Sequence, residues 1–595
     1  MSEDRVALIK IKEGTSIYRN AESHLGKGFF KYYYKGKCEK VDKCLILFCD
    51  KEKINRLFWC KCVCCCDDKG RYLKCESKFS SSLAAVITNA CDSIFLDINK
   101  DFKDSYIEIE TSNKLCKQFE QFEIDKQEYE KQNRTYNTID IENSLHKLAQ
   151  KNEYCKRQFD LKEPTADGRS EYQRDYDRII YCKSFRRMVD KTQIFSSTKG
   201  DHYRTRMTHT MIVCQIARSI CNALHFNQAL TESIAIAHDL GHTPFGHVGE
   251  RKLNDILQDR FPEVGGFKHN YQGLRVVSKL EKSYYEIDGL DLSYQVMEGM
   301  FKHTKQKAGV DISEFINDDN LRSFLHLEYP FSITIEGQIV AIADEIAQRS
   351  HDIDDAFSSN LLSFNEFLSY LKLKKFKELS DEIIAIEKRK NKCEKVMVTD
   401  SDELFSCQIS SAIVKYFIKD VIKASESGIK EYLDKNALDF NSSHIVKDKL
   451  IVFSDSGELI CNYLEKMLNN KVIGSNEVTI SDQNSAIIIE SLFNAYYDNP
   501  KLLHDGTKRK IYKDFINLTD RGSYSIDLVE GSQSAVEMEV ENIQNAYKLE
   551  DTIIDEYKLK QKILVRDICD YIAGMTDTYA SSQYEKICKT VYSNR

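Results

Sequence analysis

From about residue 165 to residue 595, apolar residues recur at the spacing of α-helices. In the stretch "THTMIVCQIARSICNAL" (208–224), Ile212, Ile216 and Ile220 stand four residues apart, so they form one apolar stripe on a helix. The whole chain contains only five prolines in 595 residues, which is typical of long helices with few rigid turns. The periodicity therefore predicts a mainly α-helical fold.

Two further segments show the same helical pattern. The first, "TESIAIAHDL" (231–240), predicts a short apolar helix for which Thr231 is the expected N-cap. The second, "EGQIVAIADEIAQRSHD" (336–352), predicts a longer helix that is buried or amphipathic. Both segments carry acidic and imidazole side chains within apolar surroundings, which is unusual for a helix whose only role is packing.

A chain of this length is too long for one hydrophobic core, so we expect at least two domains. Residues 1–125 contain short runs rich in β-branched, aromatic and cysteine residues, such as "RVALIKIK" and "CLILFCD", and one expected helix near "SSSLAAVITNA". They predict a small α+β domain. Residues 126–164 are charged and predict a helical linker, and helical regions follow over 165–360 and 361–595.

The N-terminal domain holds a cysteine cluster, "WCKCVCCC" (59–66). On one strand, alternate side chains lie roughly 6.5 Å apart, whereas the sulfur atoms around one zinc ion lie less than about 4 Å apart. We therefore interpret the cluster as part of a hairpin across "DDKG" (67–70), with small apolar cysteines facing a core. Metal binding or redox chemistry is the alternative.

The net charge of −8 and the absence of a long apolar run favour a soluble protein without a membrane span. The first residues, "MSEDRVALIKIK", have acid where a signal peptide has base. Twenty cysteines in a large chain of this kind fit a reducing compartment. We expect a cytoplasmic protein.

Half of the histidines lie close together in the sequence. Of the fourteen, seven fall within 68 residues: 202, 209, 225, 238, 242, 247 and 269. His238 and Asp239 form an adjacent imidazole–carboxylate pair at the end of an apolar helix, and Asp344 lies inside the apolar run "IVAIADEIA". A buried ionised aspartate is costly unless a cation meets it. Lys302 and His303 in "FKHTK" are interpreted as structural, with a contact to phosphate as the alternative.

Together, His209, His238, Asp239 and Asp344 offer two nitrogen and two oxygen ligands. Such a mixed set suits a divalent cation such as Mn, Mg, Fe or Zn that keeps open positions for water. A metal ion of this kind lowers the pKa of bound water and orients a phosphate group. The sequence therefore predicts a divalent metal site that can activate water beside a phosphate group.

The pattern H…HD…D resembles that of the HD-domain metal-dependent phosphohydrolases. The surrounding segments narrow the likeness, because they occur in the order found in the deoxyguanosine triphosphate triphosphohydrolases. These segments are "DYDRIIYCKSFRRMVDKTQIF", "YRTRMTHTMIVCQIAR", "AHDLGHTPFGHVGE", "FKHNYQGLRVV", "EGQIVAIADEIAQRSHDIDDA" and "DYIAGMTDTYA". The resemblance covers residues 165–356 densely and then the last segment, and it does not reach residues 1–125. It implies that 165–360 is the HD-domain catalytic core and that 361–595 completes the triphosphohydrolase domain.

Enzymes of that family cleave a dNTP into a deoxynucleoside and tripolyphosphate. The resemblance implies that His209, His238, Asp239 and Asp344 are the metal ligands, and that water activated there attacks the α-phosphorus. His247 and Glu250 match the catalytic histidine and its acidic partner; three residues apart, they share one face of a helix. An imidazole paired in this way assists proton transfer, because the carboxylate sets its tautomer.

The resemblance also implies substrate contacts. Arg206, His242 and His269 match groups on the phosphate side of the pocket. Gln193 and Asp352 match groups that hydrogen-bond the sugar 3′-hydroxyl. Four residues after the last metal aspartate, the family commonly has a tyrosine that packs against the sugar, whereas this chain has Gln348.

The implied partners are a dNTP substrate, dGTP above all, an allosteric dNTP or single-stranded DNA, and further copies of the chain in a homo-oligomer such as a hexamer. The implied role is nucleotide-pool control or phage defence. Two alternatives stay open. One is another HD-domain phosphohydrolase or phosphodiesterase, which Gln348 favours. The other is a nucleotide or nucleic-acid sensor that works through residues 1–125.

Overall fold

The structure is a computed structural model, and the chain divides into two compact units, residues 1–136 and 137–595. In the first unit it describes the backbone of strands between residues 5 and 108. In the second it describes residues 142, 144–159, 168–193, 204–304, 312, 315, 318–359, 361–371, 376–393, 401–519 and 551–589. Each unit is considered by itself.

The first unit contains a six-stranded sheet with the strand order β2-β5-β4-β3-β1-β6. The strands are β1 (Arg5–Lys12), β2 (Phe29–Tyr33), β3 (Lys43–Asp50), β4 (Lys53–Asp67), β5 (Gly70–Ser77) and β6 (Tyr106–Glu108). Strands β1 and β3 run parallel, and the other neighbouring pairs run antiparallel. The helix expected near "SSSLAAVITNA" lies outside the described residues, so the α+β class of this unit stays a prediction.

The cysteine cluster lies on β4. This strand forms a hairpin with β5, in which Asp67 pairs with Gly70, so the hairpin predicted across this turn is present. In the register of the sheet, Cys62 lies opposite Cys75 on β5, and Cys60 lies opposite Cys44 on β3. The packing of the cysteine side chains lies outside the described residues.

The second unit is helical in its described residues, as predicted. Its α-helices are α6 (Glu171–Tyr181), α7 (Lys183–Arg187), α8 (Arg206–Ala223), α9 (Gln228–Ala237), α10 (Gly246–Arg260), α11 (His269–Arg275), α12 (Tyr294–Phe301), α13 (Asp319–Phe324), α14 (Ile335–Ser358), α15 (Phe364–Leu371), α16 (Lys377–Cys393), α17 (Ser401–Ser443), α18 (Asp455–Leu468), α19 (Asn476–Asp498), α20 (Asp505–Thr519), α22 (Asp551–Ala573) and α23 (Asp577–Tyr584). Within the segment 126–164 that was expected to be a helical linker, the described residues 142 and 144 are α-helical, and residues 145–159 contain the 3-10 helix Asn152–Tyr154.

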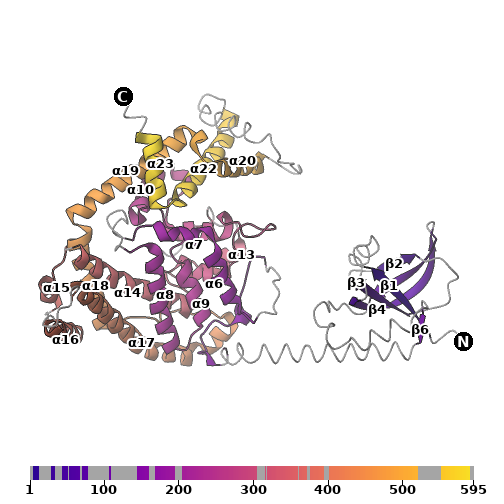
Figure 1. Ribbon diagram of the computed structural model, residues 1–595, viewed down its shortest axis with the longest axis horizontal. Helices are drawn as coiled ribbons and strands as arrows, with labels where there is room; N and C mark the ends of the chain where they lie inside the picture. The colour runs from indigo at the N-terminus through magenta and orange to yellow at the C-terminus, as the bar shows by residue number, and fades with distance from the viewer. Residues whose placement is uncertain are drawn as a thin grey trace. The chain divides into compact units, whose positions relative to one another are not determined.

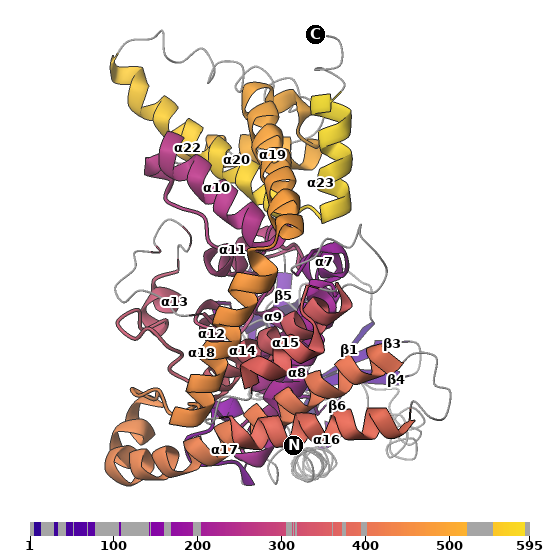
Figure 2. The ribbon, with the colours of Figure 1, turned by 90° about the vertical axis from the view of Figure 1, so that its left-hand side faces the viewer.

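The larger hydrophobic core lies among α8, α9, α12, α14 and α17, which pack against one another (Figures 1 and 2). The isoleucine stripe predicted on α8 contributes to it, since Ile216 and Ile220 are buried and Ile212 packs at its edge. Helices α15 to α18 extend this core. The metal ligands predicted from the sequence lie on α8, on α14 and directly after the end of α9, so core packing of these three helices fixes their positions.

A second, smaller core joins α10 to the C-terminal helices. Leu253 and Leu257 of α10 pack with residues of α19, α20, α22 and α23, among them Phe493 and Ile568. Figure 2 shows these five helices together above the larger core, with α22 and α23 in yellow. The region 361–595 thus contributes to both cores, and its last helices hold the helix that carries His247 and Glu250.

A tight turn separates α9 from α10. Helix α9 begins at Gln228 and is capped by Asn227, whose side chain accepts from the Leu230 N–H, so the expected N-cap Thr231 is wrong. The Thr231 hydroxyl instead donates to the Asn227 carbonyl, because it already lies one turn inside the helix. At the other end of the turn, Phe245 and Gly246 both adopt positive φ angles, 59° and 56°, which reverses the chain before α10.

Candidate metal centre and active site

The four predicted metal ligands converge from three places in the larger core. His209 lies in the first turn of α8, His238 and Asp239 follow the end of α9, and Asp344 lies in the middle of α14. His209 Nε2 lies 2.9 Å from Asp344 Oδ1. His238 Nε2 lies 3.4 Å from Asp239 Oδ2 and 3.8 Å from Asp344 Oδ1. Two imidazoles and two carboxylates thus face one point.

The hydrogen bonds of His238 prepare it to bind a metal ion. Its Nδ1 lies 2.6 Å from the Ala235 carbonyl, which can only accept, so Nδ1 carries the proton. Its Nε2 is buried and has no hydrogen-bond partner among the described residues. Burial opposes a charge on this ring, yet the Asp239 carboxylate raises the pKa of His238 to about 9. The pocket therefore attracts a cation, and the ligand atoms fit a divalent metal ion.

Arg206 lies at the start of α8 and is almost wholly buried, with 1% of its surface exposed. Its Nη1 donates to Asp239 Oδ2 at 2.7 Å. Within the described part of the chain, its Nε and Nη2 have no hydrogen-bond partner. A buried guanidinium with two unused N–H donor groups beside the predicted metal ligands is suited to bind an anion such as phosphate.

His247 and Glu250 lie on the first turns of α10. His247 Nδ1 lies 3.2 Å from Glu250 Oε2, and the His247 side chain is half exposed. The same carboxylate accepts from His269 Nδ1 at 2.9 Å and from the His269 backbone N–H. Burial works against its charge, but hydrogen bonds from His247 and His269 hold the pKa of Glu250 well below its usual value. Glu250 is therefore an anion that orients two imidazoles.

His242 lies between the metal ligands and this pair. Its Nε2 is 3.1 Å from Asp239 Oδ1, and its ring stacks on that of His269 with centroids 3.9 Å apart. Burial and the neighbouring Arg206 lower the pKa of His242, so its ring is neutral. The stack is close because Gly241 contacts α11: a Cβ there would lie 2.0 Å from the His269 carbonyl oxygen.

The three residues expected at the sugar come from two segments of the chain. Gln193 lines a hollow of about 90 Å³ together with His247 and Arg251. Gln348 and Asp352 follow Asp344 on α14 by one and two turns, so they share its side of the helix. Burial and the nearby Asp355 raise the pKa of Asp352, and its Oδ1 has no partner among the described residues.

Two histidines that were not assigned to the site lie within it. His351 Nδ1 is 3.1 Å from His209 Nδ1 and therefore fixes the ring of a predicted metal ligand. His303, interpreted from sequence as structural, is buried, and its Nε2 lies 3.3 Å from His269 Nε2. The signal for His303 was present, because this imidazole stands two residues after the apolar helix α12, much as His238 stands just after α9.

The described residues form three groups whose possible ligand atoms all lie within 4.8 Å of one another. They are His209, His238 and Asp239; His242, His247, Glu250 and His269; and Asp239, His269 and His303. All three belong to one continuous cluster. Asp344 joins the first group through its short distance to His209.

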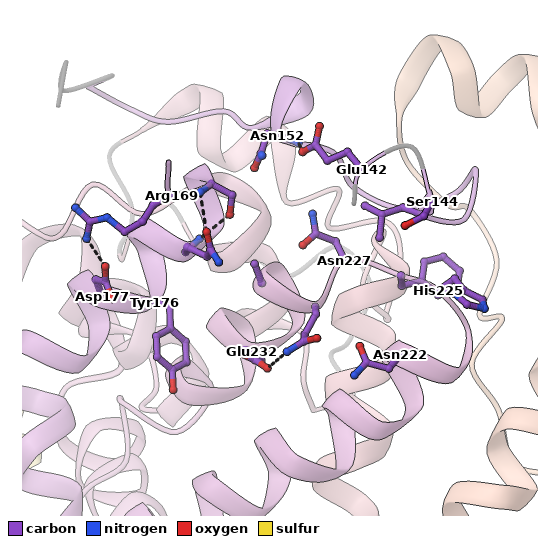
Figure 3. Close-up of a pocket in the computed structure, with 16 residues that line it drawn as sticks. Glu142, Ser144, Asn152, Arg169, Tyr176, Asp177, Asn222, His225, Asn227 and Glu232 are labelled. Carbon is purple, nitrogen blue, oxygen red and sulfur yellow. Dashed lines mark hydrogen bonds and ion pairs between the residues drawn. The ribbon is translucent and has the colours of Figure 1, made fainter. Parts of the chain in front are cut away.

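A separate cavity of about 570 Å³ lies between α6 and the junction of α8 and α9 (Figure 3). Its polar lining includes Tyr176, Asn222 and Glu232, as well as His225, which is exposed at the end of α8. None of the three groups of candidate ligands among the described residues includes a residue of this cavity. The candidate metal ligands among the described residues therefore lie apart from this cavity.

The C-terminal helices are tied to the turn that shapes the site. The Asp577 carboxylate accepts from the backbone N–H groups of Phe245 and Thr192, each at 2.8 Å, and from the Thr192 hydroxyl. The buried Lys191 ammonium bridges the carbonyls of His242 and Ala573. These contacts explain why the segment "DYIAGMTDTYA" accompanies the histidine motifs in the sequence.

Two segments of the chain match known protein families. Residues 206–349 match the HD domain, and residues 540–586 match the phosphohydrolase-associated domain. HD domains are metal-dependent phosphohydrolases, and the converging ligands of this chain fit that requirement. The fold and the cluster therefore define a metal-dependent hydrolase of the HD class.

Curated relatives narrow the class to a family. The chain is 32% identical to the deoxyguanosinetriphosphate triphosphohydrolase-like protein of Sinorhizobium medicae over 435 residues, which are 71% of this chain and 90% of the relative. Proteins of the same description from Rickettsia rickettsii and Rickettsia canadensis are also 32% identical, over 72% and 71% of this chain and 94% of each relative. The chain belongs to the deoxyguanosinetriphosphate triphosphohydrolase-like family and is an HD-type nucleotide phosphohydrolase.

Among the helices that the structure describes, none combines the length and the hydropathy that a membrane span requires.

Proposed function

We propose that the chain hydrolyses a dNTP to a deoxynucleoside and tripolyphosphate. The observation that carries this proposal is the position of the His247–Glu250 pair, which lies beside the HD cluster and shares His242 and His269 with it. A proton-transfer group next to a phosphate-activating centre is what cleavage of a phosphate ester needs.

His209, His238, Asp239 and Asp344 are the proposed metal ligands. A divalent ion held there supplies Lewis-acid stabilisation of phosphate oxygens and lowers the pKa of water. The protein fixes the ligands through an outer layer of contacts, because His351 orients His209 and the Ala235 carbonyl orients His238.

His247 is the proposed proton-transfer residue. Its Nδ1 bonds to Glu250, so its Nε2 is free to face a substrate at the half-exposed surface of the site. In this role Nε2 protonates the departing 5′-oxygen of the deoxynucleoside. Glu250 remains ionised and stabilises the imidazolium form that gives up the proton.

Arg206, His242 and His269 form the proposed phosphate side. The two unused donors of Arg206 are suited to oxygens of the triphosphate chain. Gln193 and Asp352 are proposed to bind the sugar 3′-hydroxyl. Gln348 is proposed to lie beside the sugar ring. Because this position holds an amide instead of an aromatic ring, we expect weaker selection against substrates with a 2′-hydroxyl.

We further propose dGTP as the first substrate to test, because the relatives are described as deoxyguanosinetriphosphate triphosphohydrolase-like. A homo-oligomer such as a hexamer, regulation by a dNTP or single-stranded DNA, and a role in nucleotide-pool control or phage defence are part of the same proposal. Residues 1–125 are proposed as an α+β domain that senses such a signal, and 165–595 as the catalytic region.

One alternative keeps the same cluster but changes the product. Gln348 favours a nucleotide phosphohydrolase or phosphodiesterase that acts on another nucleotide, because the expected aromatic is missing. Tripolyphosphate as the product excludes this alternative, whereas pyrophosphate or monophosphate supports it.

The other alternative is a nucleotide or nucleic-acid sensor that works through residues 1–125. Deleting these residues tests it: unchanged hydrolysis, dNTP response and DNA binding would reject the sensor role.

The proposal is tested by giving the purified full chain each dNTP and rNTP with Mg²⁺, Mn²⁺ or Fe²⁺ and separating the products. We expect deoxynucleoside and tripolyphosphate from at least one dNTP. The Asp344→Asn variant should lose both metal and activity, and His225→Ala, at an exposed histidine outside the cluster, is the matched control. Metal-loaded protein that produces no tripolyphosphate from any dNTP would reject the proposal.

A further inference from the structure

We propose that Cys62 and Cys75 form a reversible disulfide bond across the hairpin of β4 and β5. The bond belongs to the first unit and does not depend on the proposed metal centre. The register of the sheet places the two cysteines directly opposite one another, Cys62 on β4 and Cys75 on β5. The function proposed above leaves this cysteine-rich hairpin unexplained.

Six cysteines of the described strands share one face of the sheet. Alternate residues of a strand lie on the same face, and directly opposite residues of neighbouring strands also share a face. By this rule the register places on one face Cys44 of β3, Cys60, Cys62, Cys64 and Cys66 of β4, and Cys75 of β5. Two cross-strand pairs result, Cys62 with Cys75 and Cys60 with Cys44. Cys65 lies on the other face.

The hydrogen-bond pattern of the hairpin favours the pair of Cys62 and Cys75. The turn between the strands has two residues and closes on Asp67 and Gly70, and such a turn closes on a hydrogen-bonded pair. The two kinds of pair alternate along a hairpin, so Cys62, five residues before Asp67, forms a non-hydrogen-bonded pair with Cys75. The Cα atoms of such pairs lie about 4.5 Å apart, and those joined by a disulfide lie about 4.4–6.8 Å apart.

The pair of Cys60 and Cys44 is of the other kind. Because Cys62 is not hydrogen-bonded to β5, its backbone groups, and those of Cys60 two residues earlier, are directed toward β3. Cys60 therefore forms a hydrogen-bonded pair with Cys44. In sheets, the Cα atoms of such pairs lie about 5.5 Å apart, further than in the other kind. Of the two pairs, Cys62 and Cys75 are the better placed for a disulfide.

The same register argues against a zinc ion at these thiols. Next to the cross-strand pair, the nearest cysteines along β4 on this face are Cys60 and Cys64, two residues to either side of Cys62. Positions two residues apart on a strand are separated by roughly 6.5 Å, whereas the sulfur atoms of one zinc site lie less than about 4 Å apart. The sheet thus brings two thiols together but not four, which suits a disulfide.

Bond formation is a two-electron oxidation, and a small disulfide such as oxidised glutathione is the oxidant. The thiolate of one cysteine attacks this disulfide and displaces one small thiol, which leaves a mixed disulfide. The thiolate of the second cysteine then attacks the protein sulfur of the mixed disulfide and displaces the second small thiol. Two protein thiols are oxidised, the small disulfide is reduced to two thiols, and the two protons pass to these thiols.

The spacing of the strands makes the bond reversible. In a non-hydrogen-bonded pair the Cβ atoms lie about 4.5–5.5 Å apart, whereas those of a disulfide lie about 3.8 Å apart. The bond must therefore draw the two strands together, and strained disulfides are the more easily reduced ones. An excess of the small thiol should restore both cysteines.

Trypsin separates the two cysteines, so mass spectrometry can detect the bond. Cleavage after Lys61 and Lys69 gives "CVCCCDDK", which begins with Cys62, and cleavage after Lys74 gives "CESK", which begins with Cys75. The full chain is equilibrated with reduced and oxidised glutathione at several ratios, alkylated and digested. We expect the cross-linked pair of peptides to increase with the oxidised fraction and to disappear when reduced glutathione is added in excess.

Two serine variants identify the cysteine on β4, because the longer peptide carries four cysteines. Cys62→Ser should lose the cross-link to Cys75. Cys64→Ser is the matched control, since this position lies on the same face but opposite Leu73, and it should keep the cross-link. Circular dichroism of the reduced proteins confirms that a lost cross-link does not come from unfolding.

Absence of the cross-link from the unchanged chain in the most oxidising buffer would overturn the proposal. A cross-link that persists in Cys62→Ser, or that is also lost in Cys64→Ser, would overturn it as well. So would zinc that the reduced, chelator-stripped chain binds and that Cys62→Ser does not, because the thiols would then hold a metal. None of these outcomes bears on the second unit, so the function proposed above is tested separately.

Discussion

Glu250 accepts hydrogen bonds from His247 and His269, so one carboxylate serves both the exposed imidazole and the buried one. From sequence it was paired with His247 alone. The three-residue spacing on α10 predicts that contact, but His269 is nineteen residues further on, and only the close approach of Gly241 to α11 brings it near. At the scale of single residues, the contact between two side chains on the same helix could be predicted. The contact between side chains that a turn brings together could not.

The first prediction concerns proton transfer. Replacing His247 by alanine should lower kcat about 10²- to 10⁴-fold, because general acid catalysis is lost. Metal content should stay unchanged, since none of the proposed metal ligands is altered. Steady-state kinetics and elemental analysis check both expectations. A full loss of bound metal in His247→Ala would show that this histidine is a ligand rather than a proton donor.

The second prediction concerns sugar selection. The Gln348→Tyr change places an aromatic ring one turn beyond Asp344, where the family commonly has one. Packing against the sugar should raise the preference for dGTP over GTP about 10-fold, a size typical of packing contacts in substrate selection. Competition assays with both nucleotides measure the ratio. An unchanged ratio would place the sugar away from this face of α14.

At the scale of elements, helix α14 connects the site to the rest of the core. The apolar spacing of 336–352 predicts this helix and places Asp344 within it, where its side chain is only 20% exposed, and the structure extends the helix to Ser358. The start of the helix was less predictable, because it depends on distant partners: the buried Glu336 accepts from the backbone N–H groups of Gln150 and Asn227. Sequence periodicity does not encode such links.

The third prediction is a pH dependence of stability. Burial raises the pKa of Glu336 to about 7, from about 4.3 in an unfolded chain. The folded protein therefore binds this proton more tightly, so the stability it contributes is complete below about pH 4.3 and is lost as the pH rises through 7. The loss is at most about 4 kcal/mol, because the pKa differs by about 2.7 units and each unit corresponds to about 1.4 kcal/mol.

Melting temperatures of the unchanged protein and of Glu336→Gln between pH 5 and 8 test this assignment. The difference between the two proteins should shift in favour of the variant as the pH rises, since glutamine does not ionise. Other buried carboxylates affect both proteins alike, so they cancel in the comparison. A difference that does not change with pH would show that Glu336 is not the group that titrates.

At the scale of the whole chain, two regions far apart in sequence meet at the candidate site. The HD match ends at residue 349, and the phosphohydrolase-associated match begins at residue 540. Asp577 joins them through Thr192 and Phe245. The motif order in the sequence predicts that both regions belong together. The contact itself could not be predicted, because it depends on how α10 packs against the C-terminal helices.

The fourth prediction concerns this link. Asp577→Asn replaces a carboxylate oxygen by a donor that meets another donor, which costs about 1–3 kcal/mol at a buried position. The turn before α10 should shift, and kcat/KM should fall about 10-fold with metal content retained. Asp505→Asn, at a surface carboxylate of α20, is the control. Equal activity in both variants would mean that the C-terminal helices do not position His247.

The central claim is that this HD cluster releases tripolyphosphate from a dNTP. The most direct measurement is ³¹P NMR of a dGTP reaction run in ¹⁸O-labelled water with Mn²⁺. The account predicts tripolyphosphate as the phosphorus-containing product, with the label on its terminal phosphate and none in the deoxyguanosine. Pyrophosphate, orthophosphate or a nucleotide monophosphate as the first product, or label in the deoxyguanosine, would contradict it.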